Sequence, residues 1–143
     1  MSNRKSRRRR AKEAKHVRLY DWMLTSPAYL HLTCPARAVL IEIARLYDGA
    51  NNGRLALSTR VAAQRCRISK DTATRAFAEL QSLGFIECVT PGAFSRKIRH
   101  AAEWRLTWQR CDVTGNLSTK PFMHWGRQKT KHGPKLFCDS TLN

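Results

Sequence analysis

Apolar residues recur at helical spacing in the stretch between Pro35 and Gly49. They stand at positions i, i+3, i+4 and i+7, which is the rhythm of a helix with one buried face. Cys34 stands where we expect the N-cap, although serine or threonine is the usual residue there. Pro35 suits the first turn, and Gly49 ends the helix. Its apolar positions are Ala36, Val39, Leu40, Ile43, Leu46 and Tyr47.

Two more helices follow a short alternating strand at residues 54–57. Ser58 is a good N-cap for a helix over residues 59–66, in which we expect Val61, Ala62 and Cys66 to point inward. A turn at Arg67-Ile68 leads to a second N-cap, Ser69, and Asp71 favours the positive end of the next helix dipole. Gly84 ends that helix, whose apolar stripe is Ala73, Ala76, Phe77, Leu80 and Leu83.

The apolar period then changes from helical spacing to alternation. Residues 85–90 and 102–108 alternate as strands, and Pro91-Gly92 breaks the first of them. A basic loop at residues 95–100 joins the two strands. We therefore predict a hairpin directly after the helix pair.

The regions on either side of this pattern are less regular. Residues 19–24 fit a short strand or a helical turn, and Ser26-Pro27 is typical of a helix start. The apolar cluster Tyr20, Trp22, Met23, Leu24 and Tyr29 belongs either to the core or to a homodimer surface. Residues 109–143 show no regular pattern, apart from the island Pro121 to Trp125, which either docks on its own domain or binds a partner protein. We thus divide the chain into an arm (1–18), a domain (19–108) and a tail (109–143).

The order of the predicted elements is that of a winged helix, an α+β fold with three helices and a β-hairpin wing. The residues that carry a family resemblance are Leu57-Ser58, Ala62-Ala63, the run from Ile68 to Phe77, Leu80, and the run from Leu83 to Ile86. This stretch resembles bacterial winged helix-turn-helix regulators. It looks like the DNA-binding modules of the GntR and MarR groups, and it is most similar to small helix-turn-helix domain proteins.

One position departs from that pattern. The turn between the two helices often carries glycine in a left-handed conformation, whereas Arg67 stands here. A residue with a side chain pays roughly 1 kcal/mol for that conformation. Either Arg67 accepts this cost, or the turn adopts another geometry.

The charge of the chain favours a polyanionic partner. The 143 residues include 27 Lys+Arg and 10 Asp+Glu, which gives a net charge of +17. Residues 1–18 alone carry nine bases and one acid. Such a run repels itself and has little apolar surface to bury, so we expect it to be disordered when free and to lie on phosphates or in a groove when bound. Its central arginines are Arg7, Arg8, Arg9 and Arg10.

The resemblance implies that the helix after Ser69 enters the major groove of double-stranded DNA. Arg75 points away from the apolar stripe and is our candidate for a bidentate contact to guanine, while Thr74 faces a base or a thymine methyl group. We expect phosphate contacts from Ser69, Lys70 and Thr72. The wing residues Arg96, Lys97 and Arg99 are further backbone candidates, as are Arg54 and Arg60.

Other chemistry has little support in the sequence. The five cysteines are 22 to 32 residues apart and the five histidines do not pair with them at metal-ligand spacing, so we expect free thiols, no metal and no cofactor. We find no phosphate loop or nucleophile pattern, and hence expect no enzyme. We also find no secretory signal and no apolar run that spans a membrane. A cytoplasmic, nucleoid-associated protein fits these observations.

Three functions remain open on the sequence. The first is a sequence-specific regulator of transcription. The second is a plasmid or phage replication initiator or partition protein, which would bind repeated sites. The third is an RNA-binding protein that acts through the arginine-rich arm.

Overall fold

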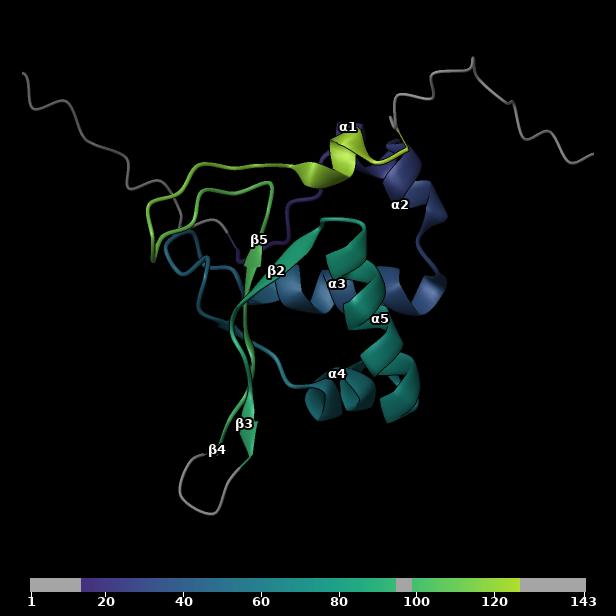
Figure 1. Cartoon of the computed structure of the whole chain (residues 1–143), viewed down its shortest axis with the longest axis vertical. Helices are drawn as coiled ribbons and strands as arrows, with labels where there is room; N and C mark the ends of the chain where they lie inside the picture. Colours follow the sequence, from purple (N-terminus) through teal and green to yellow (C-terminus); the bar gives the residue numbers. More distant parts are fainter. Residues whose placement is uncertain (1–13, 95–98, 127–143) are drawn as a thin grey trace, which may run out of the picture.

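The computed structural model describes residues 14–94 and 99–126. Within these ranges the protein combines helices with a small antiparallel sheet, which confirms the α+β class (Figure 1). The helices are α1 (Asp21–Leu24), α2 (Pro27–His31), α3 (Cys34–Leu46), α4 (Thr59–Cys66) and α5 (Lys70–Ser82), with the 3-10 helix η1 (Pro121–His124). The strands are β1 (Leu55–Ala56), β2 (Ile86–Thr90), β3 (Ala93–Phe94), β4 (Arg99–His100) and β5 (Glu103–Leu106).

Serine residues occupy the N-cap positions of three helices. The Oγ atoms of Ser26, Ser58 and Ser69 each accept a hydrogen bond from a backbone amide three residues further on. Such caps satisfy amides that have no partner inside the helix. The two caps predicted for the helix pair are therefore confirmed.

The start of α3 differs from the prediction. Cys34 is its first helical residue, and Thr33 occupies the N-cap position with no capping bond from its own side chain. Instead, Glu79 of α5 accepts hydrogen bonds from the amide and the hydroxyl of Thr33, at 2.8 and 2.7 Å. The prediction of Cys34 as the cap was wrong because Cys34 is already helical, while Thr33 has the extended backbone of an N-cap and is held by a residue 46 positions away.

The three-stranded sheet has the order β1-β5-β2, and both pairings are antiparallel. Trp104 of the central strand lies opposite Leu55 of β1 and Cys88 of β2. A register irregularity lies between Cys88 and Thr90, and after it Thr90 pairs with Glu103. The pairing of β2 with β5 confirms the predicted hairpin. Toward its tip, β3 and β4 pair as a separate two-stranded ribbon that projects from the sheet in Figure 1, so Arg99 and His100 are extended rather than part of the predicted loop.

The core lies between α3, α5 and the sheet. The predicted apolar stripe of α5 is buried from Ala73 to Leu80. In α4, however, Val61 is 43% exposed, and Ala62 and Ala63 are buried. The prediction that Val61 points inward was wrong because one helical step of about 100° separates it from Ala62, which lies on the buried side of α4. Cys66 is half-buried against the core.

The segment before α2 is helical rather than extended. It forms the single turn α1, in which Met23 is fully buried. Tyr20 and Leu24 pack against the core, and Tyr20 stacks on Trp22. The core role of this cluster is thus observed for Met23, whereas Trp22 stays 37% exposed.

The Phe122 side chain joins the core from beyond residue 108. It is fully buried and stacks on Phe85, with ring centroids 4.4 Å apart. The edge of Trp108 contacts the same ring. This confirms that the island docks on its own domain, and the packed body therefore extends through η1 rather than ending at residue 108.

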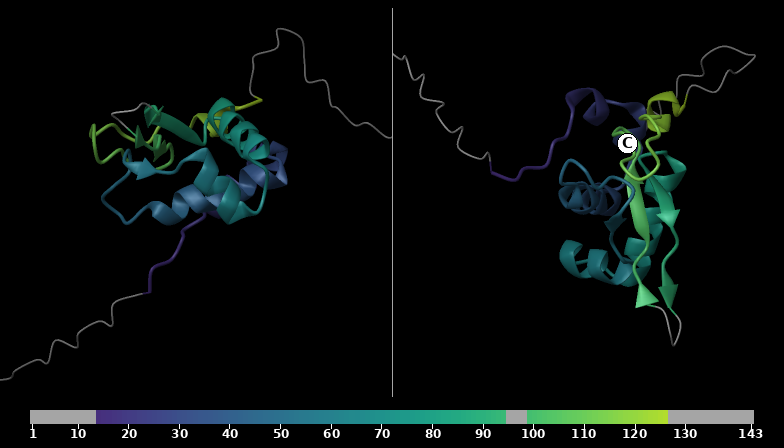
Figure 2. Two further views of the ribbon diagram at one scale, coloured as in Figure 1. Left: turned by 90° about the horizontal axis from the view of Figure 1, so that it is seen from below. Right: turned by 90° about the vertical axis from the view of Figure 1, so that its left-hand side faces the viewer.

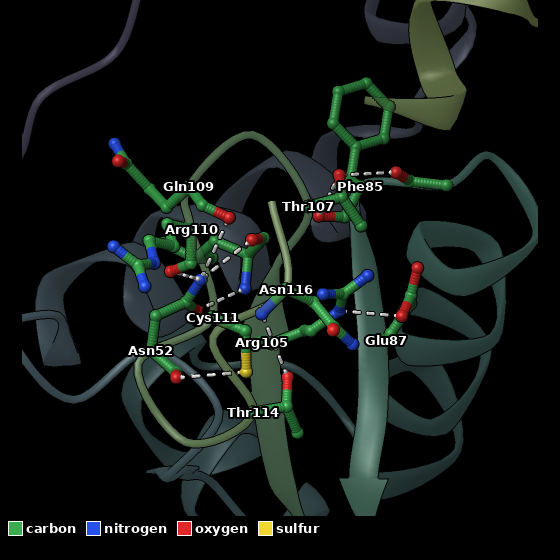
Figure 3. Close-up of polar contacts among 12 residues, drawn as sticks. Asn52, Phe85, Glu87, Arg105, Thr107, Gln109, Arg110, Cys111, Thr114 and Asn116 are labelled. Carbon is green, nitrogen blue, oxygen red and sulfur yellow. Dashed lines mark hydrogen bonds and ion pairs between the residues drawn. The ribbon is translucent and has the colours of Figure 1, made fainter. Parts of the chain in front are cut away.

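The buried side-chain amide of Asn52 fixes the segment between β5 and this island (Figure 3). Asn52 Nδ2 donates to the carbonyls of Leu106 and Arg110, at 3.0 and 2.9 Å, and Asn52 Oδ1 accepts from the amide of Leu106. Nearby, the hydroxyl of Thr107 donates to the carbonyl of Gly84. These bonds attach the segment after β5 to the turns before β1 and β2.

Within the described residues, no helix is both long and apolar enough to cross a membrane. No cluster of His, Cys, Asp or Glu suited to a metal ion occurs there either.

Candidate nucleic-acid interface

Helices α4 and α5 form a compact pair joined by a turn at residues 67–69. The amide of Ile68 donates to the carbonyl of Ala63 at 3.0 Å, and the amide of Arg67 donates to the carbonyl of Gln64 at 3.4 Å. These two bonds make a Schellman motif, which requires a left-handed residue after the helix. Arg67 is that residue, with φ 55°. The turn therefore has the geometry that usually calls for glycine.

Helix α5 rests on the sheet through its apolar side. Phe77 stacks on Trp104 of β5 at a centroid distance of 4.8 Å, and the Trp104 indole donates to the carbonyl of Leu57. Arg75 and Thr74 are exposed. The helix thus has one anchored face and one free face, as predicted for Arg75.

The predicted DNA-contact residues at the start of α5 differ in their exposure and in their hydrogen bonds. Lys70 is exposed. The Ser69 hydroxyl is hydrogen-bonded to the Thr72 hydroxyl at 2.8 Å, and the Thr74 hydroxyl donates to the carbonyl of Lys70. Three hydroxyl groups that we predicted to contact DNA, those of Ser69, Thr72 and Thr74, are therefore already hydrogen-bonded within α5 and its N-cap. The cationic side chains are the groups with the most freedom to reach a ligand.

Two carboxylates brace the helix pair against α3. Glu79 of α5 holds the start of α3 through Thr33, as described above. Glu42 of α3 pairs with Arg65 of α4, and also with Arg45 at 3.1 Å. The hydrogen bond from Arg65 is the main cause that lowers the pKa of Glu42 below its ordinary value. These contacts fix the orientation of α4 and α5 relative to α3.

The hairpin lies at the same end of the molecule as α4. Figure 1 and the right-hand view of Figure 2 agree on this placement, with the β3–β4 ribbon and α4 below the sheet. Arg99 is exposed on β4, and Arg54 and Arg60 are exposed beside β1 and in the first turn of α4. Positive groups from β4 and α4 therefore lie at this end of the body, whereas Arg54 precedes Leu55, which pairs with Trp104 farther from the hairpin than Ala56 does.

Several predicted contacts lie outside the described residues. These are Arg96 and Lys97 of the hairpin loop, and Arg7, Arg8, Arg9 and Arg10 of the arm. The first described residues, purple in Figure 2, leave the body near α3.

Sequence reasoning missed Arg67 as a candidate contact. It is exposed, it lies between the two helices of the pair, and it carries a positive charge. The signal was present in the sequence as an arginine at the position of the usual turn glycine. We treated it only as a departure from the pattern.

Comparison of the chain with protein-family models, with curated proteins and with solved structures finds no match. The function is consequently argued from the fold and from this surface.

Proposed function

We propose that the protein binds specific sites on double-stranded DNA, with α5 in the major groove and the hairpin on the sugar-phosphate backbone. The observation that carries this proposal is the side of α5 opposite its apolar stripe, on which Arg75 is exposed, together with the β3–β4 ribbon that projects from the sheet. The order α3, β1, α4, α5, β2, hairpin, β5 and the sheet order β1-β5-β2 support the proposal, because we expect both in a winged helix.

The dimensions of α5 suit this role. A helix with side chains is about 10–12 Å wide, and the major groove of B-DNA is about 12 Å wide. The stack of Phe77 on Trp104 holds the opposite face, so the exposed residues point away from the body. The planar fork of Arg75 matches O6 and N7 of guanine.

Electrostatic attraction supplies affinity that does not depend on sequence. The net charge of +17 acts on phosphates through counterion release, and about half of it resides in residues 1–18. Because phosphates are alike at every base pair, this charge adds no base preference. Specificity in this proposal depends on the few side chains on the outer face of α5.

Selection from random duplexes, followed by fluorescence anisotropy across a salt series, tests the proposal. We expect an enriched motif and a strong salt dependence. Absence of any enriched motif would refute specific binding, and equal binding of structured RNA by the isolated arm and the full chain would favour an RNA function.

Arg75→Ala should relax the base preference at one position of that motif, because about 1–3 kcal/mol of discrimination is lost with a bidentate contact. Arg110→Ala is the matched control, since Arg110 is also exposed but lies beyond β5. Unchanged base preference in the Arg75 variant contradicts the assigned contact. Removal of residues 1–15 should instead weaken binding to all duplexes and flatten the salt dependence.

We propose regulation of transcription as the biological role of this binding. The positions of bound sites in the genome test it. Sites at promoters support a regulator, whereas sites clustered as direct repeats assign the protein to replication or partition.

A further inference from the structure

Arg67 adopts a backbone conformation that favours glycine. Its φ and ψ are 55° and 44°, in the left-handed region where a Cβ atom is crowded. The turn cannot relax locally, because the hydrogen bonds from the amides of Arg67 and Ile68 to the end of α4 depend on this conformation. An arginine at this position therefore costs stability that glycine would not cost.

Within the described residues, the Arg67 side chain makes no polar contact that would offset this cost in stability. Within residues 14–94 and 99–126, its guanidinium makes no hydrogen bond or ion pair, and the residue is exposed. Arg65, two positions earlier, already pairs with Glu42 and places a cation in the last turn of α4. The positive charge of Arg65 thus already lies at the negative end of the α4 dipole, so Arg67 is not needed there.

The surroundings of Arg67 favour an anionic ligand. Arg60, Gln64 and Arg67 follow each other at spacings of four and three residues, so they lie on one side of α4, and all three are exposed. Residues 59–69 contain three arginines and no acidic residue. This side of α4 therefore presents positive charge without a competing carboxylate of its own.

We infer that the Arg67 guanidinium donates to a phosphate of the DNA backbone, so that the turn as well as α5 contacts the duplex. The inference rests on the proposed DNA binding. A guanidinium fork pairs well with two phosphate oxygens. Strained residues persist where function requires them, and here the rigid Schellman turn fixes the point from which the side chain leaves the body.

Four variants of the full chain separate charge from backbone strain: Arg67→Ala, Arg67→Gly, Arg67→Lys and the control Arg110→Ala. Anisotropy with a selected duplex and a random duplex of equal length measures binding between about 50 and 200 mM salt, a range over which one phosphate contact accounts for roughly a threefold change. Arg67→Ala and Arg67→Gly should both lower the salt slope by about 0.9, equally on the two duplexes. Arg67→Lys and the control should keep the original slope.

Thermal melting shows whether the turn itself has changed. Arg67→Gly should melt at a higher temperature than Arg67→Ala, because only glycine adopts the left-handed conformation without strain. Equal loss of DNA affinity in two variants of unequal stability then assigns the loss to the missing charge.

Two results would overturn the inference. If both uncharged variants bind with the wild-type slope, Arg67 contacts no phosphate. If Arg67→Ala binds weakly and Arg67→Gly binds normally, the turn geometry and not the charge is responsible. A wild-type chain that binds neither duplex would instead refute the proposed function itself, which is a separate result.

Discussion

Phe122 offers the sharpest test of how the body is built. Its ring is fully buried, stacks on Phe85 at 4.4 Å, and has Trp22 and Trp108 at 6.1 and 6.3 Å. The neighbouring backbone is also close, because a Cβ atom on Gly84 would lie 2.7 Å from Pro121 Cβ. Phe122→Ala should therefore leave a cavity between rigid rings that cannot collapse easily.

The expected cost follows from this environment. Truncation of a buried phenylalanine typically costs about 3–5 kcal/mol, and the surrounding aromatic pairs favour the upper half of that range. Domains have a total stability of about 5–15 kcal/mol. At about 4 °C per kcal/mol for a body of this size, the midpoint of thermal unfolding should fall by about 16–20 °C.

Urea and thermal unfolding followed by far-UV circular dichroism measure this effect without relying on the fluorescence of the adjacent tryptophans. Leu117→Ala is the matched control, since Leu117 belongs to the same segment but is 76% exposed. The control should change stability by less than about 0.5 kcal/mol. If Phe122→Ala changes stability no more than the control does, the docking of η1 on the body is refuted.

The remaining predictions concern two polar contacts. Asn52→Ala should destabilise the protein by about 2–4 kcal/mol in urea unfolding, because the buried Leu106 amide and at least one carbonyl lose their partner; a change below about 0.5 kcal/mol would contradict the assigned network. Because Arg65 lowers the pKa of Glu42, this carboxylate adds stability that is complete above its unfolded pKa and is lost as the pH falls through the lower, folded pKa. Glu42→Gln should thus be less stable than wild type near pH 7 by under about 1 kcal/mol. The difference should begin to shrink as the pH falls below the unfolded glutamate pKa of about 4.3; a stability difference that does not shrink with acid would exclude this cause.

The local features of the helix pair could be predicted because their causes lie within a few residues. Ser58 and Ser69 each cap a helix through an amide three positions away, so a short stretch of sequence contains both partners. The apolar stripe of α5 is likewise a local repeat. For the conformation of Arg67 the sequence allows two alternatives, because it shows the missing glycine but not the hydrogen bonds of the turn.

The misplaced features depend on contacts between distant residues. Val61 is apolar and adjacent to the buried face of α4, and only the packing of α4 on α3 and α5 decides that it stays exposed. The acceptor at the start of α3 is Glu79, far along the chain from Thr33. Hydrophobic periodicity cannot predict the contact between Thr33 and Glu79, because neither residue departs from the pattern of its own segment.

The sequence by itself determined the order of the elements from α3 to β2, the caps of the helix pair and the excess of positive charge, since periodicity, capping and composition are local or additive properties. The tertiary structure decided which irregular segments belong to the body. The ring of Phe122 and the amide of Asn52 take their roles from partners that folding brings together across the chain. Burial and hydrogen bonding depend on those partners, so these two roles became visible only in the packed fold.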